Sequence, residues 1–293
     1  MTDLGEVITA MVTPFTDDLE VNYEAAARLA NYLADNGSDG ILLFGTTGEV
    51  PTLNKEEKIK LVEVVKEEVG DKVNIIVGTG SYSTQASIEM TKTATDLGVD
   101  GVMLVTPYYN KPPQDGLDKH FKQVAEVTDL PVILYNVPSR TSKNIEAETV
   151  ARLAEVENIV AVKEASGDLE QVATVNRLTD DDFLIYSGDD GLTLPILSVG
   201  GTGVVSVAAH LVGNRIKEMI HCYKSGQVQK AAQLNAELGD VFAKIFITTN
   251  PIPVKKAVNL IGYEAGPVRP PLVDANQQQT EALKSLLQNH NLL

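Results

Sequence analysis

The chain has 293 residues, of which 43% are apolar and 22% charged, a composition typical of a soluble globular protein with a substantial core. Its formal net charge of -16 argues against binding to nucleic acid, whose phosphates need a face rich in lysine or arginine. The one cysteine, Cys222, excludes an internal disulfide and lacks the partners of a structural zinc site.

The N-terminal segment and the length of the apolar runs indicate a cytoplasmic protein. Residues 1–6 (MTDLGE) are acidic, and no apolar signal-peptide core follows them. No segment reaches the roughly 18 continuous apolar residues that a membrane helix needs, and no basic run suggests an anionic membrane surface. We therefore expect neither a membrane nor a nucleic acid as a partner.

Short apolar runs recur along the chain and predict eight β-strands. These runs are Val7–Val12, Gly40–Phe44, Val73–Val77, Gly101–Val105, Pro131–Tyr135, Ile159–Lys163, Phe183–Tyr186 and Gly203–Val205. Most segments between them have apolar residues at three- and four-residue spacing, which predicts helices. The clearest are Tyr23–Leu33, Lys55–Val69, Thr84–Leu97 and Ala147–Val156.

This alternation of strands and helices favours right-handed βα units and a parallel sheet. A doubly wound sheet usually has five or six strands, whereas eight βα units predict a closed (β/α)8 TIM barrel, an α/β fold.

After Val205 the pattern becomes helical. Further helices are predicted at Ile216–Tyr223, Gln227–Phe246, Pro253–Leu260 and Gln277–Leu287. Gly262–Pro271 contains three prolines and predicts an ordered connector on the surface. We therefore expect a barrel over residues 1–225 and a C-terminal helical region over residues 226–293.

Polar residues follow nearly every predicted strand. Because active sites of such barrels form at the C-terminal ends of the strands, these residues are predicted to share one rim. The segments are TP (13–14), GTTGE (45–49), GTG (78–80), TPYYN (106–110), YNVPSRT (135–141), KEASGD (163–168) and SGDD (187–190).

Lys163 is the most informative of these residues. It ends the apolar run that starts at Ile159, so its side chain is expected to begin inside an apolar barrel mouth. Such a setting favours the neutral amine, which can attack a ketone and form a Schiff base. The alternatives are a surface lysine at a strand end or a structural ion pair with a carboxylate.

Tyr135 also ends an apolar strand, where core packing with the hydroxyl at the rim competes with a role in proton transfer. Tyr108 and Tyr109 follow Pro107 in a loop. Two adjacent aromatic side chains seldom both pack into one core, so at least one is expected to meet a partner surface or the site.

Two further segments suit carboxylate binding. Thr46 and Thr47 precede a helix that is predicted to begin near Asn54 or Lys55, so their hydroxyls and backbone N–H groups can hold an anion. The alternative is a Gly-rich turn that binds nothing. Arg140, after Pro138, can grip a carboxylate bidentately, although most exposed arginines do nothing so specific.

Taken together, GTTGE (45–49), VTPYYN (105–110), YNVPSRT (135–141), KEASGD (163–168) and GGTGVVSV (200–207) resemble the dihydrodipicolinate synthase family. This family is a branch of the pyruvate-dependent, Schiff-base class I aldolases, and the resemblance runs in order from about residue 5 to 270. GTTGE is typical of the whole superfamily. The arginine of YNVPSRT and the KEASGD segment are more specific to the branch.

The resemblance implies a role for each matching position. Lys163 matches the Schiff-base lysine and Tyr135 the proton-relaying tyrosine. Thr46 links that tyrosine to Tyr109, which in the family reaches across a tight dimer interface into the neighbouring site. The remaining implied roles are pyruvate-carboxylate binding by Thr46 and Thr47, aspartate-semialdehyde binding by Arg140, and the lining of the pyruvate pocket by Gly188 and Val205.

The chemistry implied by the resemblance is the condensation of pyruvate with aspartate semialdehyde in lysine and diaminopimelate biosynthesis. The imine serves as the electron sink, so no metal and no organic cofactor is required. The family usually assembles as dimers that pair into tetramers, so a homo-oligomer is expected.

Four alternatives differ in what they require. A sister aldolase, such as N-acetylneuraminate lyase or a 2-keto-3-deoxy sugar-acid aldolase, shares the lysine, but Arg140 suits a second substrate with a carboxylate. A metal-dependent hydrolase needs clustered imidazoles, and the four histidines are scattered. A phosphate-binding barrel is disfavoured by Asp189 and Asp190 after the seventh strand. A non-catalytic binding module would leave the whole polar set together by accident.

Regulation is where the sequence departs from part of the family. Lysine-inhibited members bind lysine in a cleft at the tight dimer interface, using a serine, an alanine, two histidines, an asparagine, a glutamate and a tyrosine. The matching positions here are Val50, Pro51, Lys55, Lys58, Tyr82, Ala86 and Tyr108, of which only the tyrosine is kept. The glutamate that would balance the positive charge of bound lysine is absent, and Lys55 and Lys58 add positive charge to the cleft. Like charges about 4–8 Å apart repel by tenths to a few kcal/mol. Weak or no inhibition by lysine is therefore predicted.

Overall fold

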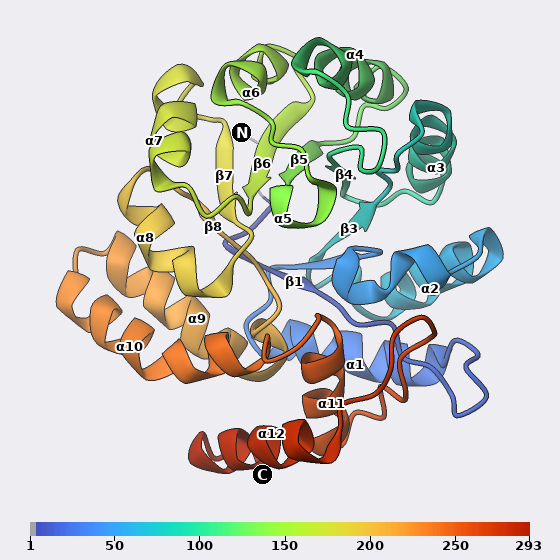
Figure 1. The fold of residues 1–293 in the computed structure, drawn as a ribbon, viewed down its shortest axis with the longest axis vertical. Helices are drawn as coiled ribbons and strands as arrows, with labels where there is room; N and C mark the ends of the chain where they lie inside the picture. The colour runs from blue at the N-terminus through green and yellow to red at the C-terminus, as the bar shows by residue number, and fades with distance from the viewer. Residues whose placement is uncertain (1–3) are drawn as a thin grey trace. The chain divides into compact units, whose positions relative to one another are not determined.

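The structure, a computed structural model, describes residues 4–293; residues 1–3, which begin the acidic N-terminal segment, lie outside the described part. Eight parallel strands form a closed barrel in the order β1 to β8, with helices between successive strands (Figure 1). The predicted (β/α)8 barrel is therefore confirmed. The strands are β1 Val7–Ala10, β2 Gly40–Leu43, β3 Asn74–Gly78, β4 Gly101–Val105, β5 Val132–Asn136, β6 Ile159–Glu164, β7 Leu184–Ser187 and β8 Gly203–Ser206.

Each predicted strand is present, and its ends differ from the prediction by no more than two residues. The reason lies in the burial of the strands. All residues of β1, β2 and β5 are buried, as expected for parallel strands covered on both faces. Such strands consist of continuous apolar runs, which are easily recognised in a sequence.

The chain forms two compact units. Unit 1 comprises the N-terminal residues up to Glu6 and Asn74–Val205, and unit 2 comprises Val7–Val73 and Ser206–Leu293. The predicted boundary between residues 225 and 226 stays a prediction.

In unit 1 the strands β3 to β7 pair in parallel, each with the next along the chain. Figure 1 shows α3, α4, α6 and α7 on the outer side of these strands. The helices of this unit are α3 Thr84–Asp96, α4 Gln114–Ala125, α5 Pro138–Thr141, α6 Ala147–Ala154, α7 Leu169–Leu178 and α8 Thr193–Ser198, with a 3-10 turn η3 Asp190–Leu192. The predicted helices Thr84–Leu97 and Ala147–Val156 are thus confirmed as α3 and α6.

In unit 2 the strands β1 and β2 pair in parallel. The predicted helices Tyr23–Leu33 and Lys55–Val69 are confirmed as α1 (Tyr23–Asp35) and α2 (Lys55–Val69), and two 3-10 turns, η1 (Thr46–Gly48) and η2 (Val50–Thr52), precede α2. Asn54 and Glu57 form a reciprocal capping box that fixes the start of α2.

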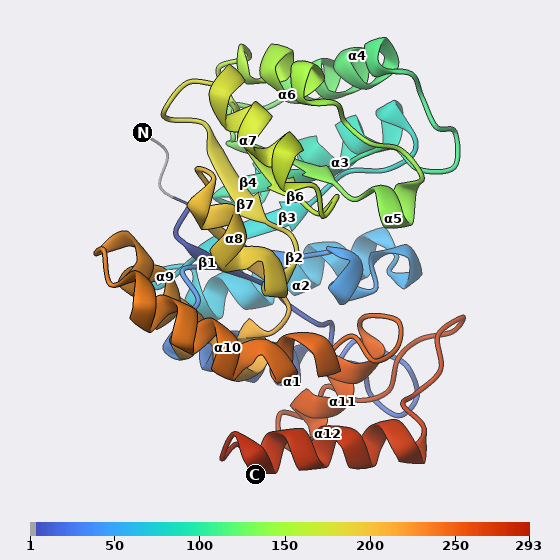
Figure 2. The same ribbon diagram turned by 60° about the vertical axis from the view of Figure 1, so that its left-hand side comes forward.

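The remaining helices of unit 2 are α9 Ala209–Lys224, α10 Val228–Lys244, α11 Ile252–Leu260 and α12 Gln277–Asn289. All four predicted C-terminal helices are therefore present, although α9 begins seven residues before the predicted Ile216. Its first five residues, 209–213, are all buried, so they lack the one-sided pattern of a surface helix. Figure 2 shows α12 beside α10 and α11. The connector at residues 262–271 contains neither helix nor strand, as predicted. Within residues 4–293, no helix is both long and apolar enough to cross a membrane.

Candidate active site

Lys163 lies near the C-terminal end of β6, in register with Tyr135 on β5 and Tyr186 on β7. It is buried, with 6% of its surface exposed, and its Nζ lies 4.2 Å from the centroid of the Tyr135 ring. No carboxylate of residues 4–293 forms an ion pair with it. A surface lysine and a structural ion pair are therefore both excluded, and the amine faces an aromatic ring instead of a counter-ion.

Gly188, just after β7, leaves room beside this lysine. A Cβ atom at this position would lie 3.2 Å from Lys163 Cε and 2.7 Å from the Cβ of Ala165. A side chain at residue 188 would therefore press on the lysine stem. The glycine keeps open the space beside the amine.

Glu164 forms a hydrogen-bonded network with the end of β5, the loop after β6 and α7, which the sequence did not predict. Its buried carboxylate accepts hydrogen bonds from Asn136 Nδ2 (3.0 and 3.1 Å), the Ser166 N–H (2.7 Å) and Gln171 Nε2 (2.9 Å). Asn136 Oδ1 in turn accepts from the Ile145 N–H at 3.0 Å. This network joins the ends of the two strands that carry Tyr135 and Lys163. The only sequence signal was a carboxylate next to Lys163.

The β4–α4 loop carries the two adjacent tyrosines. Tyr108 is half-buried and packs edge-on against Tyr82, with ring centroids 5.4 Å apart, and burial raises its pKa. Tyr109 is 89% exposed and has a left-handed backbone with φ 66°. The two rings therefore do not share one core, and Tyr109 presents its ring to solvent. The expected contact with a partner surface or the site stays a prediction. Thr106 supports the strand end by donating to the carbonyl oxygen of Tyr135 at 2.9 Å.

The other predicted residues of unit 1 are Arg140 and Val205. Arg140 lies on the short helix α5, is exposed, and forms no ion pair within residues 4–293, so its guanidinium is available to a ligand. Val205 is buried in β8, with 1% of its surface exposed.

In unit 2, Thr46 and Thr47 begin the 3-10 turn η1 directly after β2. Thr46 is half-buried and Thr47 is buried. Asn250 Nδ2 donates to Thr47 Oγ1 at 3.0 Å. Gly48 lies in a tight space, because a Cβ there would lie 3.3 Å from the carbonyl oxygen of Met11.

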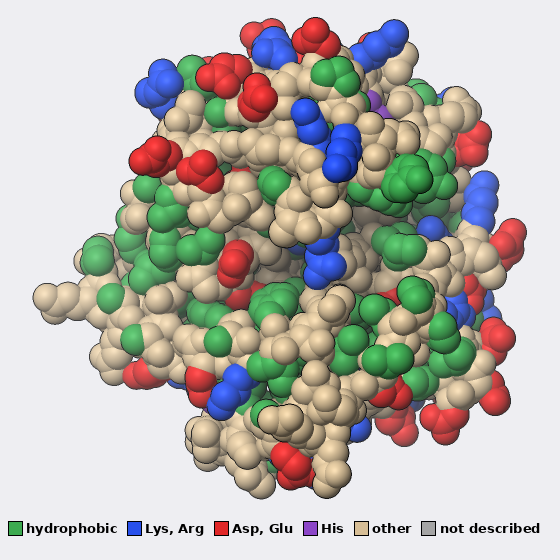
Figure 3. Space-filling model, in the orientation of Figure 1, with side chains coloured by type: hydrophobic (Ala, Val, Ile, Leu, Met, Phe, Trp, Pro, Cys, Tyr) green, Lys and Arg blue, Asp and Glu red, His purple; other side chains and the backbone are tan. Residues whose placement is uncertain are grey.

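The predicted residues thus divide between the two units. Unit 1 brings Lys163, Tyr135 and Gly188 together and places Arg140 and Tyr109 in exposed segments, whereas Thr46 and Thr47 belong to unit 2. On the face shown in Figure 3, acidic and basic side chains are interspersed.

A closed parallel barrel with a buried lysine at a strand end, unpaired among residues 4–293, is typical of a (β/α)8-barrel enzyme. Its sequence matches the Dihydrodipicolinate synthetase family over residues 3–290. The chain belongs to this family.

Relatives of known name are similar along nearly the whole chain. The 4-hydroxy-tetrahydrodipicolinate synthase of Desulforudis audaxviator is 55% identical over 291 residues, which are 99% of each chain. That of Desulforamulus reducens is 56% identical over 292 residues, again 99% of each chain. Among solved structures, DHDPS from Cyanidioschyzon merolae with lysine bound has a TM-score of 0.97 and 48% identity, covering 99% of each chain.

Proposed function

We propose that this enzyme condenses pyruvate with L-aspartate 4-semialdehyde to give 4-hydroxy-tetrahydrodipicolinate, a lyase step of lysine and diaminopimelate biosynthesis. The names of the full-length relatives support this reaction. The observation that carries the chemistry is the buried amine of Lys163, which lies 4.2 Å from the Tyr135 ring and has no counter-ion among residues 4–293. An amine held this way can act as a nucleophile.

In the proposed mechanism, Lys163 attacks the ketone carbon of pyruvate, and the carbinolamine loses water to give an imine. Loss of a methyl proton gives the enamine, whose carbon attacks the aldehyde of the second substrate. The substrate's own amine then attacks the imine carbon, closes the ring and releases Lys163. The protonated imine accepts the electron pair when the methyl proton leaves, so the proposed steps need no metal and no organic cofactor.

The proposed proton path runs from Tyr135 through Thr46 to Tyr109. A phenol beside the amine can protonate the leaving hydroxyl of the carbinolamine and take the proton back afterwards. The ring contact between Lys163 and Tyr135 supports the first step of this path.

Substrate binding is assigned to the loops after the strands, which meet at one end of a parallel barrel. Thr46 and Thr47 are proposed to bind the pyruvate carboxylate, and Gly188 and Val205 to line its pocket. Arg140 is proposed to hold the carboxylate of aspartate semialdehyde. Its exposed guanidinium, which has no partner among residues 4–293, supports this role.

We also propose a homodimer, or dimers paired into a tetramer, in which Tyr109 completes the site of the neighbouring subunit. An aromatic ring that is 89% exposed and held on a left-handed backbone supports a contact outside its own chain. The proposed location is the cytoplasm, whose reducing conditions suit the free, buried Cys222.

Weak or absent inhibition by lysine is part of the proposal. Lys55 and Lys58 lie in the first turns of α2, where they add positive charge, and the exposed Tyr82 packs against the retained Tyr108. The relative that is solved with lysine bound is 48% identical, so the two chains have room to differ at these positions.

Borohydride trapping tests the proposed chemistry. With pyruvate, reduction should add one pyruvate-derived adduct per subunit, on the peptide that contains Lys163. Lys163→Arg should give no adduct and lose nearly all activity, because a guanidinium stays protonated. An adduct on another lysine, or none in the wild type, would refute the proposal.

A further inference from the structure

A fully buried ion pair links the turn that carries Thr46 and Thr47 to α11. Lys255 Nζ on α11 is 2.7 Å from Glu49 Oε1, and each side chain is only 1% exposed. The second carboxylate oxygen, Glu49 Oε2, accepts a hydrogen bond from the backbone N–H of Arg269 at 2.8 Å. Two segments more than 200 positions away therefore hold Glu49.

Stability alone does not account for such a pair. Removing two charges from water is costly, and apolar residues of the same size often replace buried ion pairs with no loss of stability. Burial here lowers the pKa of Lys255 from 10.5 to about 8, against the opposing effect of Glu49. Burying this pair therefore costs free energy, and its benefit must lie in the residues that it positions.

Glu49 positions the threonine turn through its backbone. Its N–H donates to the carbonyl oxygen of Thr46 at 3.1 Å, and its own carbonyl oxygen accepts from the N–H and the hydroxyl of Thr52, each at 2.9 Å. It therefore closes η1 and starts η2. Its left-handed backbone, with φ 53° and ψ 36°, is unfavourable for a residue with a side chain. Such a conformation persists only where the surroundings enforce it.

A second contact from the same region acts on Thr47 directly. Asn250, two residues before α11, donates from Nδ2 to Thr47 Oγ1 at 3.0 Å. Since that oxygen already accepts a hydrogen bond, the hydroxyl proton of Thr47 remains available for donation. A bound carboxylate needs such a donor.

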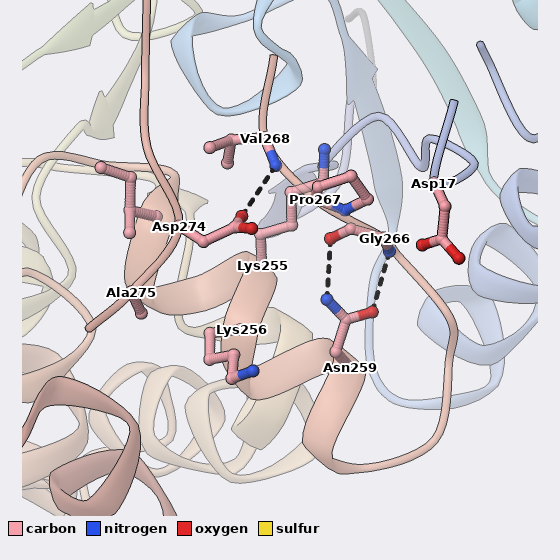
Figure 4. Close-up of a pocket in the computed structure, with 10 residues that line it drawn as sticks. Asp17, Lys255, Lys256, Asn259, Gly266, Pro267, Val268, Asp274 and Ala275 are labelled. Atoms are coloured by element: carbon pink, nitrogen blue, oxygen red, sulfur yellow. Dashed lines mark hydrogen bonds between the residues drawn. The ribbon is translucent and has the colours of Figure 1, made fainter. Parts of the chain in front are cut away.

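The connector after α11 is itself anchored. Asn259 and Gly266 exchange two hydrogen bonds of 2.8 Å, and the Val268 N–H donates to Asp274 Oδ1 at 3.1 Å (Figure 4). These contacts hold the backbone that leads to Arg269.

Arg269 extends the same network to α2. Its guanidinium bonds to Glu57 and to the carbonyl oxygens of Leu19 and Thr52. The centroid of the Phe15 ring lies 3.9 Å from Lys255 Nζ and 4.3 Å from Arg269 Cζ. Lys255 and Arg269, the two residues that bond to the Glu49 carboxylate, are thus held by further contacts of their own.

We propose that Glu49 and Lys255 are positioning residues, through which α11 and its connector set the geometry of Thr46 and Thr47 for binding the pyruvate carboxylate. This inference rests on the proposed function, because it assumes that the two threonines bind pyruvate. It assigns a role in substrate affinity to side chains that do not touch substrate.

The test compares the concentration of pyruvate that half-saturates imine trapping in the wild type, Lys255→Met, Glu49→Gln/Lys255→Met and the control Lys256→Met. Lys256 follows on the same helix but leaves it in another direction (Figure 4). Lys255→Met should raise the half-saturating concentration about tenfold or more, as expected when hydrogen bonds to a charged ligand are misaligned. At saturating pyruvate the extent of trapping should match the wild type, and Lys256→Met should leave both values unchanged.

The double variant separates positioning from folding, because it leaves no uncompensated buried charge. We expect it to regain the melting temperature of the wild type while it keeps the raised half-saturating concentration. A purely structural pair would lower the fraction of active protein in Lys255→Met without changing pyruvate affinity, and the double variant would then bind pyruvate normally. Either result overturns the inference. If the wild type forms no adduct on Lys163, both the proposed function and this inference are refuted. If every variant is trapped with unchanged pyruvate affinity, only the positioning role is refuted.

Discussion

Replacing Glu164 by glutamine should destabilise the protein from within the strand-end network. The carboxylate accepts hydrogen bonds from Asn136, Ser166 and Gln171, four in all, and is 2% exposed. A glutamine keeps one acceptor oxygen, so it retains the bonds to that atom and turns an N–H₂ group toward the remaining donors. With the oxygen placed at Oε1, the hydrogen bond from Gln171 and one of the two contacts that share an Asn136 hydrogen are lost, and the bonds that remain no longer go to a charged group.

Each such bond contributes about 1.5–3 kcal/mol. Gln171 is half-buried and can turn to water, and Asn136 still donates to Asn144, so the lower part of this range applies. We therefore expect Glu164→Gln to lower the free energy of unfolding by about 2–4 kcal/mol.

Urea denaturation at neutral pH measures this loss, with Glu170→Gln as the control. Glu170 is the next acidic residue of the chain after Asp168 and is exposed. The control should stay within about 0.5 kcal/mol of the wild type. A change for Glu164→Gln that is equally small would show that the network does not hold the strand ends.

The other predictions concern the site and its titration. Arg140→Ala should raise the KM for aspartate semialdehyde about ten- to a hundredfold while pyruvate is still trapped; unchanged semialdehyde kinetics, or better turnover of N-acetylneuraminate, would favour a sister aldolase. Mixing inactive Lys163→Ala and Tyr109→Phe subunits should restore some activity, since one hybrid site holds both intact groups; a fully active monomer in sedimentation would contradict this. Titrating lysine into the assay at subsaturating pyruvate should cause little inhibition, and strong inhibition at submillimolar lysine would count against the proposed loss of the lysine site. Burial lowers the pKa of His210 from 6.5 to about 4, so the unfolded chain binds the proton at a higher pH than the folded chain. The free energy of unfolding should therefore fall as the pH drops from about 6.5 to 4, by about 3 kcal/mol at most. His210→Gln should show a flatter dependence of urea stability on pH over this range, and equal slopes in the two proteins would refute the assignment.

The architecture could be predicted because buried parallel strands are written as continuous apolar runs. The burial of Lys163 and Tyr135 was predictable for the same reason, since both stand at the ends of such runs. The helix α4 was not singled out. Its Leu117, Phe121 and Val124 are buried at helical spacing, but the two prolines just before the helix and Gly116 in its first turn are typical of a loop.

What could not be predicted are the contacts that join distant segments. The pairing of Glu49 with Lys255 spans 206 positions, and nothing local in either segment indicates it. Asn136 and Glu164 are closer, 28 positions apart, but they meet only because β5 and β6 are neighbours in register. Periodicity reports which face of an element is buried, and it does not report which polar group lies opposite.

The GTTGE segment illustrates why sequence reasoning left two readings open. Gly48 has a steric explanation that needs no ligand, because a Cβ there would lie 3.3 Å from the carbonyl oxygen of Met11. A turn that only connects β2 to α2 has no need of a buried carboxylate, however, and an apolar residue at position 49 would avoid the cost of burying one. The structure surrounds that carboxylate with Lys255 and the Arg269 backbone. The buried charge of Glu49 therefore favours a turn that is held in shape to bind a ligand over a turn that binds nothing.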